Sequence, residues 1–168
     1  EAMSIPLVGQ GGDYFTIEQE TEIMRRIAKL HLNQKVTKVG QYFIFDMTFL
    51  FHFYGIITNN FDDTMIGQKI WRADFPAGLD FITSVHTREP YYKDEGKKWF
   101  KIGGTWETFW IYNNKDSVVT VESFPKIKQE LIRMGNLETY EAQKAIIPSL
   151  IYMQERGVKI DVEGLKDD

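Results

Sequence analysis

Residues 36–46 read VTKVGQYFIFD, a mostly apolar run that ends in an aspartate. Such a run is typical of a strand that is buried on both faces of an α/β sheet, and we expect a strand over residues 36–45. Open α/β sheets bind their ligands beyond the carboxyl ends of the strands, which is where this prediction places Asp46. The alternative interpretation is that Asp46 caps the helix that follows it.

Most of the remaining chain has helical signals. An apolar run at residues 4–8 ends in the turn-rich segment 9–13 and predicts a short strand. Residues 88–104 are polar, aromatic and rich in turn residues, and we expect a long loop there. Capping residues and apolar spacing predict helices over residues 16–32, 47–54, 62–70, 79–86, 105–134 (interrupted by Pro125) and 138–156. The expected class is α/β, with helices predominating in the later half.

Composition excludes several kinds of site. The chain has 168 residues, a formal net charge of -4 and no cysteine. One core is expected, without a disulfide or thiolate metal site, and the charge provides no broad basic surface for duplex DNA. His31, His52 and His86 are scattered and are interpreted as structural. Because no apolar run reaches the roughly 18–20 residues that span a bilayer, we expect a cytoplasmic protein, cut from a longer chain because it begins without Met.

Tyr112 and Asp116 are four residues apart in a predicted helix, so they share one face. A phenol beside a carboxylate can orient a water molecule next to a metal-bound phosphate. The same spacing also occurs between ordinary surface neighbours, so the pair alone does not define a site.

Five segments together resemble the 3′→5′ exonuclease (proofreading) domain of phage-like family A DNA polymerases. Residues 40–46 resemble its second motif, and Tyr112, Asp116 and Thr120 resemble its third. The other three segments, in the order of the family, are Asp63-Thr64-Met65, residues 90–97 (PYYKDEGK) and residues 147–161, which resemble the junction with the polymerase domain.

Two features depart from the family pattern. Tyr42 stands where the second motif has Asn, and nothing in residues 1–16 matches the first motif, Asp-x-Glu. The resemblance therefore implies a ribonuclease H-like (DnaQ-type) domain with an incomplete sheet that lacks the first strands. It also implies a partial exonuclease domain over residues 1–135 and a helical connector into the polymerase domain over residues 136–168.

The resemblance implies two-metal hydrolysis of the 3′-terminal phosphodiester with Mg²⁺ or Mn²⁺. Asp116 would bind one ion directly, Asp46 would hold the second partly through water, and Tyr112 would orient the attacking water. Because two carboxylates stand where the family has four, we expect little or no nuclease activity from this chain alone.

The expected partner is the single-stranded 3′ end of DNA, held by stacking more than by a basic surface. The candidate contacts are Tyr42, Tyr91, Tyr92, Lys97, Lys98 and Trp99. Alternatively, Tyr92 and Trp99 close the core. Further expected partners are a polymerase domain in cis and a separate N-terminal fragment that completes the sheet, in the cytoplasm of a host cell if the protein is phage-encoded.

Two other interpretations remain open. The chain can be a catalytically dead remnant that serves as a DNA-binding or scaffolding module attached to a polymerase, which the Tyr42 substitution favours. It can also be an unrelated α/β protein, which would place Tyr112 and Asp116 far from Asp46.

Overall fold

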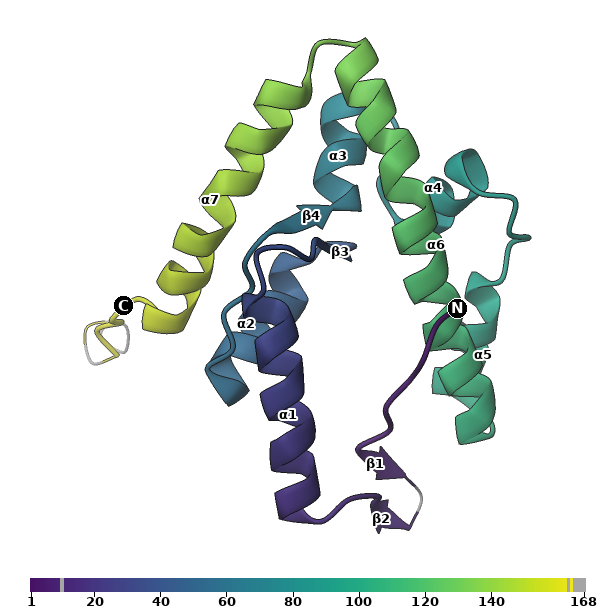
Figure 1. The fold of residues 1–168 in the computed structure, drawn as a ribbon, viewed down its shortest axis with the longest axis vertical. Helices are drawn as coiled ribbons and strands as arrows, with labels where there is room; N and C mark the ends of the chain where they lie inside the picture. The colour runs from purple at the N-terminus through teal and green to yellow at the C-terminus, as the bar shows by residue number, and fades with distance from the viewer. Residues whose placement is uncertain (10, 163, 165–168) are drawn as a thin grey trace.

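The computed structural model describes residues 1–9, 11–162 and 164, apart from the side chains of Lys97 and Phe100. Helices dominate the part of the chain that it describes (Figure 1). In chain order the elements are β1 (Val8–Gly9), β2 (Gly12–Asp13), α1 (Ile17–Leu32), β3 (Lys38–Gly40), α2 (Ile44–Tyr54), β4 (Phe61–Asp63), α3 (Thr64–Trp71), α4 (Leu79–His86), α5 (Lys93–Ile102), α6 (Trp106–Arg133) and α7 (Leu137–Arg156).

Two small sheets are present in the described residues. β1 and β2 form an antiparallel pair, and β3 lies parallel to β4 with Lys38 opposite Phe61 and Gly40 opposite Asp63. Figure 1 shows α6 and α7 meeting in a V, with α3, β3 and β4 between its arms and α1 running away from its apex. The β3–β4 pair therefore lies at the centre of the packed helices.

Local capping signals fix where the helices begin and end. Thr16 and Gln19 form a complete capping box at α1, and the Asp63 carboxylate caps α3. Gly55 adopts the left-handed conformation (φ 63°) that ends α2. The expected helices around residues 16–32, 62–70, 79–86, 105–134 and 138–156 are confirmed, and Pro125 lies inside α6. No helix in the described ranges is both long enough and apolar enough to cross a bilayer.

Two clusters of buried side chains form the core. Both receive residues from α7, so this helix packs as part of the same body as the strands. The first cluster contains Phe43, Met47, Phe61, Ile147 and Ile151, and the second contains Ile82, Phe124, Ile127, Leu131 and Tyr140.

Three expectations about local structure were wrong or only partly right. The strand predicted over residues 36–45 ends at Gly40, because Asp63 and the turn at Tyr42 start a helix within the apolar run. The loop predicted over residues 88–104 contains α5, and Trp99 of this helix and Tyr92 just before it pack against aromatic residues of α6. The strand predicted over residues 4–8 is limited to the short β1.

Helix α1 is amphipathic, yet none of its residues is buried. Ile17, Leu30 and Leu32 are exposed, and the C-terminal end of the helix is tied down by a 2.8 Å hydrogen bond between His31 and Thr58. An amphipathic helix normally buries its apolar face against another element. The apolar face of α1 is therefore available for further packing.

Replacing Asp63 by Asn should lower the free energy of unfolding by about 1–3 kcal/mol. The amide NH₂ group of Asn cannot accept a hydrogen bond, so one of the backbone N–H groups now bound to the carboxylate would lose its acceptor. The native carboxylate accepts from Phe43 N–H at 2.7 Å and from Met65 N–H at 2.8 Å. Urea unfolding measures the change. Asp74→Asn, at an exposed position, is the control and should stay within about 0.5 kcal/mol of the parent. Equal stability of the two variants would contradict the account.

Candidate active site

Asp46 lies in the first turn of α2 and not at the end of a strand. An acidic side chain is favourable there, because the helix dipole places partial positive charge at this end. The residue is exposed, but the protein packed around its carboxyl group raises its pKa, and the nearby Asp63 carboxylate adds to this effect. Asp46 therefore faces solvent, and the net effect of its surroundings is a raised pKa in spite of the favourable helix dipole.

Asp63 positions the helix that carries Asp46. Its carboxylate is almost completely buried and joins the start of α2 to the start of α3 through backbone N–H groups. Burial raises the pKa of Asp63, and these backbone hydrogen bonds offset part of that effect. The sequence interpretation named Asp63 as the first residue of a segment that resembles the family. Its 20-residue reach to Phe43 has no local sequence signal.

Tyr42 lies two residues before the first residue of α2 and has a left-handed backbone, with φ of 53°. Its side chain is 53% exposed and borders two grooves, one between α2 and the end of α7 and one between α3 and α7. Asn tolerates the left-handed region better than Tyr does. The position at which the family motif has Asn is thus a backbone position that suits Asn, and Tyr42 occupies it under strain.

Tyr112 and Asp116 lie on the face of α6 that contacts the start of α5. Asp116 Oδ1 accepts a hydrogen bond from the Tyr92 hydroxyl at 2.6 Å, and Lys93 Nζ lies 2.6 Å from the same oxygen. Lys93 Nζ also donates to the Tyr112 hydroxyl at 3.3 Å. We call these four residues the α5–α6 cluster. The structure therefore brings the predicted pair together through one shared lysine.

Tyr92 is a buried member of the α5–α6 cluster, with 4% of its surface exposed. Burial, followed by the Asp116 carboxylate, raises its pKa far above the ordinary value for a phenol. The Tyr92 hydroxyl therefore stays protonated and donates a hydrogen bond to the Asp116 carboxylate. Its ring also packs edge-on against Tyr112, with the centroids 5.8 Å apart.

Asp46 and Asp116 belong to separate groups of contacts. Among the described residues, no hydrogen bond or ion pair joins Asp46 to Tyr112 or Asp116, and no group of three or more acidic or histidine side chains is placed to hold a metal ion. The grooves beside Asp46 are lined by Tyr42 and by residues of α2, α3 and α7. The carboxylates named from the sequence do not form a complete ion-binding site by themselves.

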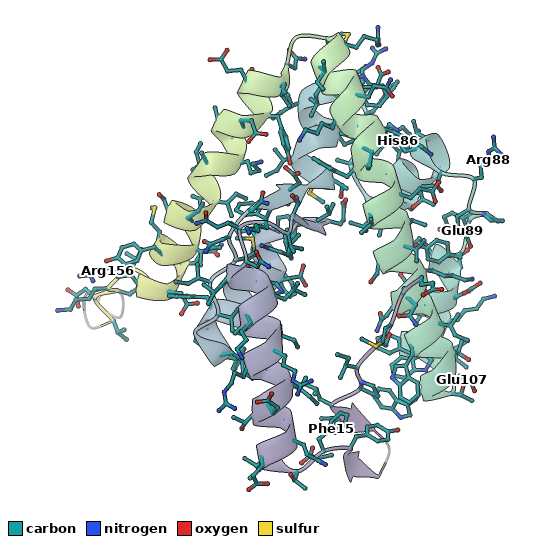
Figure 2. All side chains as sticks on the ribbon, in the orientation of Figure 1. Phe15, His86, Arg88, Glu89, Glu107 and Arg156 are labelled. Carbon is teal, nitrogen blue, oxygen red and sulfur yellow. The ribbon has the colours of Figure 1, made fainter. Side chains whose placement is uncertain are left out.

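The DNA-contact candidates are divided between surface and interior. Tyr91 and Lys98 are exposed, whereas Tyr92 is buried and Trp99 stacks on Phe109 with centroids 4.5 Å apart. The interpretation in which Tyr92 and Trp99 close the core agrees with these contacts. The side chain of Lys97 lies outside the described part of the structure. Figure 2 shows Arg88 and Glu89 projecting outward from the connection between α4 and α5.

An exposed aromatic row on α2 was missed by sequence reasoning. Phe45, Phe49 and Phe53 of this helix are 67%, 49% and 62% exposed. Their spacing of four residues places them on one face of the helix, and Phe49 packs on Phe53 with centroids 4.6 Å apart. Phe43 and Met47, also four residues apart, are buried in the core, and Ile44 and Phe51 pack against it while partly exposed.

Solved structures of nucleases share this fold. One, described as the apo form of the nuclease, has a TM-score of 0.70 and 20% sequence identity, covering 81% of this chain and 68% of that chain. Another, Brucella melitensis NrnC, has a TM-score of 0.64 and 21% identity, covering 78% and 64%. The fold is therefore the ribonuclease H-like fold of these nucleases, with a small sheet and a majority of helices.

The family follows from the sequence match. Residues 2–132 match the family described as 3′-5′ exonuclease, that of the DNA polymerase A family, and the chain belongs to it. A curated relative, DNA polymerase I from Rhizobium leguminosarum, is 29% identical over 150 residues. That match covers 83% of this chain but only 14% of the relative. The resemblance to the exonuclease domain of family A DNA polymerases is confirmed.

Tyr42→Asn should leave the free energy of unfolding unchanged or raise it by up to about 1 kcal/mol, because Asn relieves the left-handed strain at this position. Tyr42→Val should lower it by at least about 1 kcal/mol, since a β-branched residue is a steric outlier there. Thermal and urea unfolding of both variants measure the difference. A Val variant as stable as the Asn variant would show that the backbone is not strained in solution.

Proposed function

We propose that the chain is the 3′→5′ exonuclease, proofreading part of a family A DNA polymerase. In the completed domain this part hydrolyses the 3′-terminal phosphodiester of DNA, so that water attacks phosphorus and the 3′ oxygen leaves. The observation that carries the proposal is the pairing of Tyr112 and Asp116 on one face of α6, inside a chain that belongs to this exonuclease family. In the proposed site, the Tyr112 hydroxyl orients the attacking water.

The proposed substrate is a single-stranded 3′ end. The formal net charge of -4 disfavours broad electrostatic attraction to duplex DNA, whereas stacking on aromatic rings works without it. Tyr42 and Tyr91 are exposed and offer such rings, and Lys98 is exposed for a phosphate. We propose these three as the contacts with DNA.

Exonucleases of this kind generally use divalent metal ions, and we propose Mg²⁺ or Mn²⁺, two ions in the intact site, with Asp116 and Asp46 among their ligands. The described residues alone do not fit two such ions, since the Asp116 carboxylate is already paired with Lys93 and no three acidic groups converge. For this reason we propose that residues 1–168 alone have little or no nuclease activity.

We propose that further polypeptide completes the domain and that a polymerase part acts in cis. The apolar face of α1 is not buried, and β3 pairs with only one strand in the described residues. A separate or connected segment can add a strand beside β3 and cover α1 at the same time. The same segment can supply the acidic groups that the described residues lack.

A second candidate function is a DNA-binding or scaffolding module without catalysis. The ion pair between Lys93 and Asp116 favours it, because a proposed ligand that is held by an ammonium group is not free for a metal ion. The exposed aromatic row on α2 would serve such a module equally well. Activity measurements on a polypeptide that contains this chain together with a polymerase part separate the two functions.

In that polypeptide, Asp116→Asn should reduce removal of the 3′ nucleotide from single-stranded DNA by at least about 100-fold, because it loses the carboxylate that we propose as a metal ligand. Polymerase activity should be unchanged. Asp74→Asn is the control for an unrelated acidic residue on the surface. Unchanged exonuclease activity in the Asp116 variant, or none in the parent, would favour the non-catalytic module.

The chain alone should show rapid amide exchange at Val39, and the same amide should be protected in the polypeptide that completes the sheet. Lys38 N–H donates to the C=O of Asn60, the residue before β4, at 3.0 Å, and neighbouring residues of a strand point their amides to opposite edges. Hydrogen–deuterium exchange with NMR detection measures both amides. Equal protection of Val39 and Lys38 in the chain alone would contradict an open β3 edge.

A further inference from the structure

Lys93 has no part in the hydrolysis proposed above, although it is the residue that joins Tyr112 to Asp116. We propose that Lys93 is a positioning residue whose ammonium group occupies the cation position at Asp116, so that a divalent ion must displace it in order to bind. This inference rests on the proposed exonuclease site. It attributes part of the poor fit between the described residues and metal ions to the Lys93 side chain.

The geometry at Lys93 is that of a bound cation. Its Nζ lies 2.6 Å from Asp116 Oδ1 and 3.3 Å from the Tyr112 hydroxyl. It also lies 5.2 Å and 5.3 Å from the ring centroids of Tyr112 and Tyr92. One carboxylate, one hydroxyl and two aromatic rings thus surround a single positive charge.

Burial separates this contact from the ordinary surface pairs of the chain. The Lys93 and Asp116 side chains are 14% and 29% exposed, whereas those of the neighbouring pair Lys115 and Glu95 are 31% and 47% exposed and lie 3.2 Å apart. Charges screened less by water interact more strongly. The Lys93–Asp116 pair is therefore an ordered contact with a defined geometry.

The same contacts oppose metal binding in three ways. Asp116 Oδ1 already accepts from Tyr92 and Lys93, both at 2.6 Å, so the lone pairs of this oxygen are engaged and a metal ion would compete for them. The Tyr112 oxygen accepts from the same ammonium group. A divalent ion at Asp116 would also be repelled by the positive charge beside it. Removing that charge while keeping the carboxylate should therefore expose a latent cation site.

The test uses the 168-residue chain, labelled with ¹⁵N and titrated with Mn²⁺, whose paramagnetism broadens nearby amide resonances. Lys93→Met removes the charge and keeps most of the side-chain length. It should broaden the amides of residues 115–117 at an Mn²⁺ concentration at least about ten-fold lower than the parent needs. Lys93→Arg, which keeps the charge, and Lys115→Met, one residue before Asp116, should behave like the parent.

Equal or weaker broadening in Lys93→Met, or broadening in neither protein, would overturn the proposal, because removing Lys93 would then not free the site. Lys93→Gln gives a second comparison if the Met variant does not fold. Failure of both neutral variants to fold would also overturn it, since Lys93 would then be a structural support. The readout is independent of nuclease activity, so failure of the exonuclease proposal would appear in the Asp116→Asn assay and not here.

Discussion

The buried carboxylate of Asp63 is the interaction on which most of this structure depends. This carboxylate caps α3 and accepts a hydrogen bond from the Phe43 N–H just before α2. Asp63 is also the last residue of β4, and its backbone N–H donates to the Tyr140 hydroxyl of α7 at 2.9 Å. That hydroxyl in turn donates to Asp62, which Lys144 neutralises at 2.9 Å. A buried carboxylate without these partners would be costly. Its full set of hydrogen bonds therefore fixes four elements relative to one another.

This arrangement supports two functional regions in different ways. The region around Asp46 depends on Asp63 and on the strained turn at Tyr42, and it opens toward an exposed aromatic row. The α5–α6 cluster is held by its own polar contacts and aromatic packing. In the described residues, only the body of packed helices connects the two regions.

Local signals predicted most of the helices, because capping boxes, glycine ends and apolar spacing act over a few residues. The start of α2 was missed because an apolar run fits a strand and a helix equally well, and the deciding contact comes from Asp63, 20 residues away. Asp46 and the Tyr112–Asp116 pair were named from motifs. The roles of Lys93 and Tyr92 depend on how α5 packs against α6, which the composition of residues 88–104 does not encode.

The most direct test of the central claim is the polarity of DNA cleavage by a polypeptide that contains this chain and a polymerase part. Single-stranded DNA labelled at either end would be incubated with Mg²⁺, and the products separated by size. The account predicts that the 3′-labelled strand releases labelled mononucleotides. The 5′-labelled strand should give a ladder of labelled products, each one nucleotide shorter at its 3′ end. Internal cuts, or release of the 5′ label first, would contradict it.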